Sequence, residues 1–144
     1  MTNLFTHRDY LYPQIVSELE DKARKNNVIV VLADNLLSHV PDTALIKNRA
    51  IIMNMNFVVS ANYCYRLSHE LSHILYGDHE AQAVYQFSEY GKRGEELLAH
   101  RNAIKMLMSI EMPSNPLTFM SYYRVPAWLE NDVMRTYNEF KSVE

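Results

Sequence analysis

The sequence predicts an α+β fold, in which a small sheet of about three strands packs on a helix and the C-terminal half is helical. Short segments that read as strands lie within residues 28–53, whereas apolar residues recur at three- and four-residue steps on both sides of them. The 144 residues contain no internal repeat and no Ser/Gly-rich linker, so we expect one domain over 1–144. Its parts are a helix and sheet in 1–57, two helices in 58–110, and C-terminal helices in 111–144.

The first part of the chain predicts one helix followed by short strands. Residues 8–25 place their apolar side chains on one helical face, with a proline near the first turn. Val28–Leu32 is short and β-branched, which indicates a strand. Residues 36–40 suggest a helical turn. Residues 44–46 and 50–53, separated by Lys-Asn-Arg, are typical of a hairpin.

The rest of the chain predicts helices. The pattern becomes helical over residues 58–76, and Gly77 is expected to end this helix in the left-handed conformation. Residues 78–93 have no clear period. A strongly amphipathic helix follows over 95–110 and ends before two prolines. Two further helices are predicted, over 117–124 and 127–141.

Composition excludes several classes of protein. The formal net charge is -3, from 14 Lys+Arg against 17 Asp+Glu, which argues against direct nucleic-acid binding because that activity needs clustered basic residues. Apolar runs are too short to span a membrane. The single cysteine, Cys64, has no partner for an internal disulfide, and we expect it to be a core residue. The first ten residues are polar, without a secretory signal, so a soluble cytoplasmic protein is expected.

The segment His69-Glu70-Leu71-Ser72-His73 is an HExxH motif inside a predicted helix. Residues four apart on a helix share one face, with Cβ atoms roughly 5–6 Å apart, so both imidazoles can bind one Zn²⁺ ion. Glu70 would project beside the metal, where its carboxylate can accept a proton from water. The motif therefore predicts a zinc site with Glu70 as the catalytic base.

A catalytic zinc site needs a third protein ligand. His79 stands where the long metzincin motif has its third histidine, but that motif needs glycine at position 76, and the chain has Tyr76 there with the glycine one place later. The other source is the helix over 95–110. Its spacing favours Glu96, with a small residue at Ala99 to let the two helices approach.

Two neighbours of Glu96 remain alternatives. His100 shares a helical face with Glu96, so it could hydrogen-bond a ligating imidazole or bind the metal directly. Glu95 points about 100° away, and we expect it to be solvated or to lie at a helix N-terminus. Stabilisation of a developing oxyanion would need a further donor. Tyrosines such as Tyr76 and Tyr123, together with His79 and His100, supply candidates.

Three segments resemble the ImmA/IrrE family of zinc metallopeptidases. They are Ala-Ile-Ile-Met-Asn at 50–54, His-Glu-Leu-Ser-His-Ile-Leu-Tyr-Gly at 69–77, and Glu96-Leu-Leu-Ala99-His100 running through Leu-Met to a proline at 113. The likeness covers roughly residues 44–113, and the helices near 125–130 are similar to those of small prophage members. It implies His69, His73 and Glu96 as zinc ligands and Glu70 as the base. The family often has Asn where this chain has His100.

The resemblance also implies a function. Such gluzincin-like hydrolases cut a helix-turn-helix repressor and so act as anti-repressors in prophage or mobile-element switches. An extended substrate could pair with the strand at 50–53 if that strand is an edge. The alternative is a non-catalytic, zinc-stabilised protein that sequesters a regulator, with His79 or His100 closing the metal site. A DNA-associated HExxH protease of the SprT-like type would need a basic extension. The oligomeric state stays open.

Overall fold

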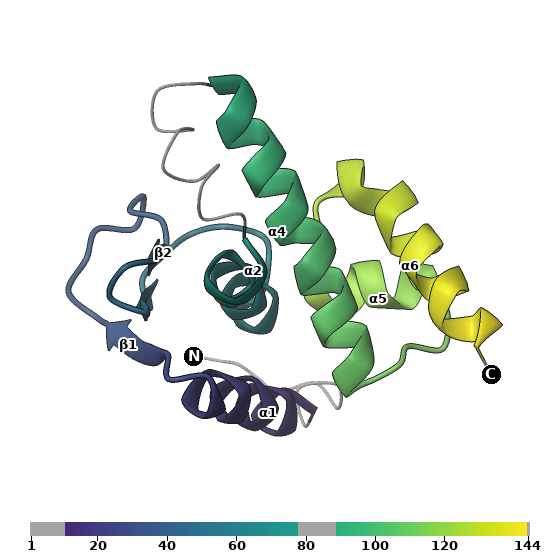
Figure 1. The fold of residues 1–144 in the computed structure, drawn as a ribbon, viewed down its shortest axis with the longest axis horizontal. Coiled ribbons are helices and arrows are strands. Elements are labelled where there is room, and N and C mark those ends of the chain that lie inside the picture. Colours follow the sequence, from purple (N-terminus) through teal and green to yellow (C-terminus); the bar gives the residue numbers. More distant parts are fainter. Residues whose placement is uncertain (1–10, 78–88, 144) are drawn as a thin grey trace.

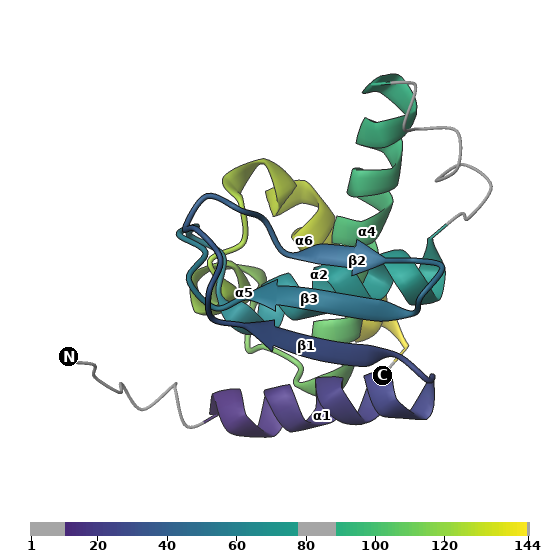
Figure 2. The ribbon, with the colours of Figure 1, turned by 90° about the vertical axis from the view of Figure 1, so that its left-hand side faces the viewer.

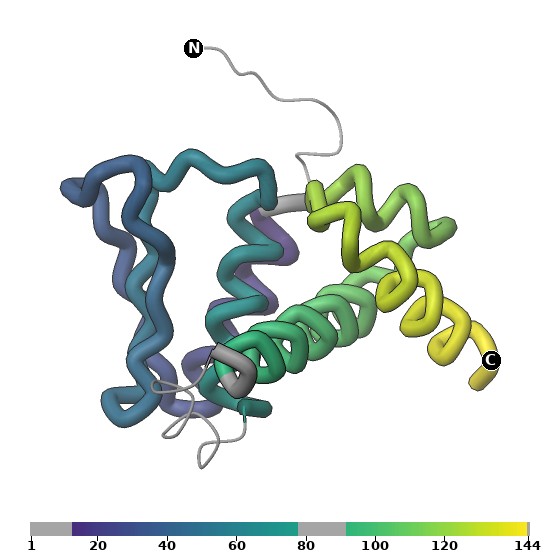
Figure 3. Tube along the Cα trace, turned by 90° about the horizontal axis from the view of Figure 1, so that it is seen from above, coloured from purple at the N-terminus to yellow at the C-terminus, as the bar shows by residue number. Residues whose placement is uncertain are grey.

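The computed structural model describes residues 11–77 and 89–143 and has the predicted α+β architecture. The sheet, helix α2, helix α4 and the pair α5 and α6 follow one another across the molecule, and α1 lies below them (Figures 1 and 3). The elements are α1 (Leu11–Lys25), β1 (Ile29–Ala33), β2 (Thr43–Leu45), β3 (Ala50–Asn54), α2 (Tyr63–Tyr76), α4 (Glu89–Ile110), α5 (Pro116–Tyr123), a 3₁₀ turn (Ala127–Leu129) and α6 (Glu130–Ser142).

The three strands lie in the order β1-β3-β2, which Figure 2 shows face on. Strand β1 runs parallel to β3, and β2 runs antiparallel to β3 as the first arm of the predicted hairpin. Strand β3 is therefore central, and both of its sides are occupied by ladder hydrogen bonds. This corrects the expectation that a substrate could pair along residues 50–53. Strands β1 and β2 are the two edge strands of the sheet.

The core lies between the sheet and the helices. Strand β3 buries alternate side chains, Ile51 and Met53, because successive residues of a strand face opposite sides. They pack with Leu67 and Leu71 of α2 and with other apolar residues from α1, α4 and α5 in one cluster. Cys64 belongs to this cluster, as expected. The buried stripe of α2 fixes the rotation of that helix about its axis, and so decides which residues face away from the core.

Helix α2 begins later and ends differently than the sequence predicts. Asn62 is the N-cap, since its side-chain oxygen accepts a hydrogen bond from the backbone N–H of Tyr65 at 2.9 Å. Residues 58–62 therefore precede the helix rather than belong to it. Gly77 does follow the last helical residue, but its φ of -70° is extended, so the predicted left-handed ending is wrong.

Two other boundaries differ from expectation. Helix α4 begins at Glu89, earlier than the predicted 95, and its early residues Lys92, Arg93 and Gly94 are exposed. This first part has no apolar face, which explains why periodicity did not detect it. The predicted helix over 127–141 is divided into the 3₁₀ turn and α6. No helix among the described residues combines the length and apolar content that crossing a membrane requires.

A buried ion pair joins α2 to the sheet. Arg66 donates from Nε to Asp42 Oδ2 at 2.8 Å and from Nη2 to the backbone oxygen of Asn54 at 2.9 Å. Asp42 also accepts a hydrogen bond from the Asn54 backbone N–H at 2.8 Å. The side chains of Asp42 and Arg66 are only 3% and 15% exposed. The pair therefore fixes the start of β2 against α2.

Replacing Asp42 with Ala is expected to lower the free energy of unfolding by about 3 kcal/mol, because the Arg66 guanidinium stays buried without its counter-charge. Urea unfolding followed by circular dichroism measures this change. The matched control is Asp21→Ala, whose ion pair with Arg24 lies on the surface of α1 and should contribute at most about 1 kcal/mol. Equal losses in the two variants would contradict the structural role of Asp42.

Candidate metal centre

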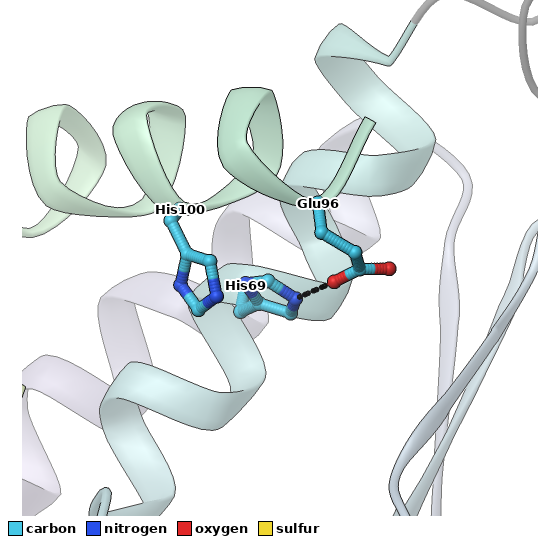
Figure 4. Close-up of side chains that lie close together, drawn as sticks. All are labelled: His69, Glu96 and His100. Atoms are coloured by element: carbon cyan, nitrogen blue, oxygen red, sulfur yellow. Dashed lines mark hydrogen bonds and ion pairs between the residues drawn. The ribbon is translucent and has the colours of Figure 1, made fainter. Parts of the chain in front are cut away.

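Helices α2 and α4 bring the predicted site residues together. His69 and His73 lie one turn apart on α2, and Glu96 and His100 lie one turn apart on α4. Figure 4 shows His69 between Glu96 and His100, which both extend from α4 toward it. Helices α2 and α4 are in contact, and Ala99, the small residue between Glu96 and His100, is 2% exposed.

The two HExxH imidazoles meet a single carboxylate. His69 Nε2 lies 2.9 Å from Glu96 Oε1, and His73 Nε2 lies 3.3 Å from Glu96 Oε2. The two rings stand edge to face with centroids 4.9 Å apart. Both Nε2 atoms therefore point at the same small region in front of Glu96. This is the arrangement predicted for His69, His73 and Glu96.

The geometry fits a metal ion. Ligand atoms that stand about 2.0–2.1 Å from a tetrahedral zinc ion are roughly 3.3 Å from one another, close to the two separations found here. Two imidazoles and one carboxylate are also a donor set that suits zinc. Among the described residues, the group whose ligand atoms all lie within 4.8 Å of one another is His69, Glu96 and His100, and this group could hold a metal ion. With His69 and Glu96 as two ligands of such an ion, a third would be His100 or, since its Nε2 lies 3.3 Å from Glu96 Oε2, His73.

Glu95 contacts the opposite nitrogen of His73 from the one that Glu96 contacts, contrary to expectation. Its side chain is 2% exposed, and its Oε2 lies 3.2 Å from His73 Nδ1, the nitrogen that faces away from Glu96. The expectation that Glu95 is solvated or at a helix N-terminus is wrong, because α4 begins six residues earlier and Glu95 lies on the face that packs against α2. A carboxylate in this place orients the imidazole and raises its basicity.

Replacing Glu95 with Ala is therefore expected to weaken zinc binding by about 10- to 100-fold, the usual effect of losing an outer hydrogen-bond partner of a ligating histidine. Competition with a chromophoric chelator measures the affinity. The control is Glu139→Ala on the exposed face of α6, which should leave zinc affinity unchanged. If Glu95→Ala binds zinc as tightly as the wild-type chain, the Glu95–His73 contact has no part in metal binding.

The charges of these groups are interdependent. Burial disfavours the imidazolium form of His73, but its hydrogen bond with Glu96 and the nearby carboxylates outweigh burial and raise the pKa of His73 to about 9. Burial also acts to raise the pKa of Glu96, yet the hydrogen bonds with His69 and His73 hold that pKa well below its usual range. The Glu96 carboxylate is therefore ionised and favours a positive charge between itself and the imidazoles.

Glu70 lies in the same cavity, which has a volume of about 430 Å³. Burial raises the pKa of the Glu70 carboxyl to about 8. One wall of the cavity is strand β2, through Thr43 and Ala44, and apolar residues including Phe57, Val59 and Pro126 form another part of the lining. The Glu70 carboxyl and the histidine–glutamate cluster therefore face one cavity.

The other predicted residues have mixed outcomes. His79 lies outside the described residues. Tyr76 is half exposed at the end of α2, with the Lys22 ammonium 5.9 Å from its ring centre, and Tyr123 is buried on α5. Within the described part of the chain, neither tyrosine lines the cavity. They are therefore poor candidates for an oxyanion donor.

The contacts that two residues make in the site were not predicted from the sequence. Glu95 shares a helical stripe with the buried alanines Ala99 and Ala103, and this four-residue spacing could have placed it against α2. The hydroxyl of Tyr65, a buried residue of α2, lies 2.8 Å from His100 Nδ1. Tyr65 stands four residues before His69, so the same spacing places it on the face of α2 that carries His69 and His73.

Comparison with models of protein families, with curated proteins and with solved structures found no match for this chain. The residues that bear on function are therefore those that the structure itself brings together. They are the HExxH pair on α2, Glu96 and His100 on α4, Glu70 in the adjoining cavity, and Glu95 behind His73.

Proposed function

We propose that this protein is a zinc-dependent endopeptidase in which His69, His73 and Glu96 hold the metal and Glu70 is the general base. One observation carries the proposal: the Nε2 atoms of both HExxH histidines face the carboxylate of Glu96, and Glu70 lines the cavity beside them. The resemblance of these segments to the ImmA/IrrE peptidases supports the same assignment.

The metal and the side chains have separate roles in the proposed hydrolysis. Bound zinc supplies a Lewis acid that polarises the peptide carbonyl and lowers the pKa of water to about 7. A carboxylate oxygen of Glu70 accepts one proton from the attacking water as the new C–O bond forms. Glu70 then delivers that proton to the peptide nitrogen as the C–N bond breaks, and the products are a carboxylic acid and an amine. Burial of the Glu70 carboxyl makes it a stronger base than a solvated glutamate.

The substrate would enter along strand β2. This strand pairs with β3 on one side only, and Thr43 and Ala44 line the cavity that holds Glu70. An extended peptide can pair with the backbone of such a strand whatever its side chains are. The resemblance implies that the substrate is a helix-turn-helix repressor, and the net charge of -3 suits a basic partner.

A second function is favoured by the position of His100. Its ring nitrogen is close enough to His69 and Glu96 to share a metal with them. If His100 joined His73 as a fourth protein ligand, the metal site would be closed and structural. The protein would then bind and sequester a regulator without cutting it.

The experiment uses the zinc-loaded chain and a peptide library prepared from a proteome digest, with cleavage sites identified by mass spectrometry. An endopeptidase produces new termini at defined bonds, and a metal chelator abolishes them. A helix-turn-helix repressor incubated in parallel tests the substrate class. Absence of chelator-sensitive cleavage in both mixtures contradicts the peptidase proposal, and four protein ligands on the zinc would then favour the binding function.

A further inference from the structure

His100 is the residue of the cluster for which the proposed zinc ligand set has no role. Its ring centre is 4.2 Å from that of His69, and one of its nitrogens lies within 4.8 Å of ligand atoms of His69 and Glu96. Figure 4 shows the ring extending from α4 toward His69, on the side opposite Glu96. His100 also lines the cavity that contains Glu70. The His100 imidazole can therefore reach a peptide bound in front of His69.

The ring is held in place from several sides. Tyr65 lies nearly parallel to it, with centroids 5.8 Å apart and an interplanar angle of 19°. Trp128 meets it edge on, with centroids 5.3 Å apart and an angle of 86°. The Tyr65 hydroxyl lies 2.8 Å from His100 Nδ1. Contacts of this kind restrict a side chain to one rotamer, which is what a preorganised catalytic group requires.

The Tyr65 hydroxyl determines which nitrogen of His100 carries a hydrogen. Tyr65 is 2% exposed, and within the described residues His100 Nδ1 is the partner found for its hydroxyl. A phenol keeps its proton at neutral pH, and a buried O–H is costly unless it donates. With the Tyr65 hydroxyl as the donor, Nδ1 accepts through its lone pair. The hydrogen of the neutral imidazole then lies on Nε2.

We propose that His100 is a catalytic hydrogen-bond donor, whose Nε2–H stabilises the oxygen of the scissile carbonyl as that oxygen gains negative charge, and that Tyr65 is its positioning residue. This inference rests on the proposed peptidase function. It assigns His100 a role other than metal ligand, because a nitrogen that carries a hydrogen has no lone pair for a metal. The missing oxyanion donor is thereby supplied by α4, one turn after Glu96.

Kinetics and zinc affinity separate the donor role from the ligand role. For His100→Ala we expect kcat to fall by about 100- to 1000-fold, the usual effect of losing one oxyanion donor. KM and zinc affinity should stay within about threefold of wild type, and His100→Gln, which retains an N–H donor, should recover part of kcat. The matched control, His39→Gln in the exposed loop after β1, should behave as wild type. Loss of zinc affinity in His100→Ala would overturn the proposal.

Nitrogen-15 NMR of the histidine rings gives a readout that does not depend on activity. In the wild-type chain His100 should carry hydrogen on Nε2 and none on Nδ1. Removing the hydroxyl with Tyr65→Phe should shift His100 toward a mixture of the two tautomers, and kcat should fall while zinc affinity is retained. A hydrogen on Nδ1 of the wild-type ring, with none on Nε2, would contradict the donor assignment.

The two proposals fail in different ways. A wild-type chain that cleaves no peptide overturns the peptidase function. An active wild-type chain whose His100→Ala variant is equally active overturns the donor role alone.

Discussion

Replacing Glu70 with Gln is expected to reduce peptide hydrolysis by about 100- to 10,000-fold, the range over which a general base contributes. Glutamine has nearly the same shape, but its amide cannot accept a proton from water. The Nε2 atoms that face Glu96 belong to His69 and His73, so the proposed metal ligands are unchanged and zinc affinity should stay close to wild type. Cleavage rates and zinc titration of the same preparation measure both effects.

The control for this variant is Glu139→Gln on the exposed face of α6. It makes the same chemical change at a residue that does not line the cavity. It should retain full activity. A Glu70→Gln chain that cleaves at the wild-type rate would show that another group takes the proton. Equal loss of zinc binding and activity would show that Glu70 holds the metal rather than the proton.

Replacing Glu96 with Ala is expected to remove zinc binding at concentrations that saturate the wild-type chain. Zinc at 100 times its dissociation constant should raise the free energy of unfolding of the wild-type protein by about 2.7 kcal/mol. Loss of a ligand should weaken binding by more than the 100-fold that an outer partner can account for. The stabilisation by zinc in Glu96→Ala should therefore be close to zero, as measured by urea unfolding with and without zinc.

Two comparisons sharpen this test. Glu95→Ala should keep a measurable part of the zinc stabilisation, because Glu95 contacts only the outer nitrogen of His73. His73→Ala should behave as Glu96→Ala does. If His73→Ala retained the full stabilisation while His100→Ala lost it, the metal would be held by His69, Glu96 and His100, and the assignment of His73 would be wrong.

The arrangement of the fold could be predicted where local pattern decides it. The β-branched segment at 28–32, the hairpin around Lys-Asn-Arg and the helix over 95–110 all appear in the structure. Strand order could not be predicted, because it depends on which strand the long-range parallel pairing of β1 selects. That pairing puts β3 in the centre, and so moves the accessible backbone to β2.

The candidate site was likewise predictable where the residue spacing within one helix decides it. A four-residue spacing on a helix dictates that His69 and His73 share a face, and likewise Glu96 and His100. The spacing does not give the rotation of α4 relative to α2, which depends on how the alanines at 99 and 103 pack. Because of that rotation Glu95 is buried behind His73 and His100 lies beside Tyr65, and neither contact is encoded in one helix alone.

The most direct test of the central claim is a crystal structure of the zinc-loaded protein. We expect a single zinc ion bound by Nε2 of His69, Nε2 of His73 and the carboxylate of Glu96, with imidazole nitrogens about 2.0–2.1 Å from the metal. The fourth position should be open to water on the side of Glu70, and His100 should remain hydrogen-bonded to Tyr65. Zinc bound by His100 as a further protein ligand, or bound away from His69 and His73, would contradict the account.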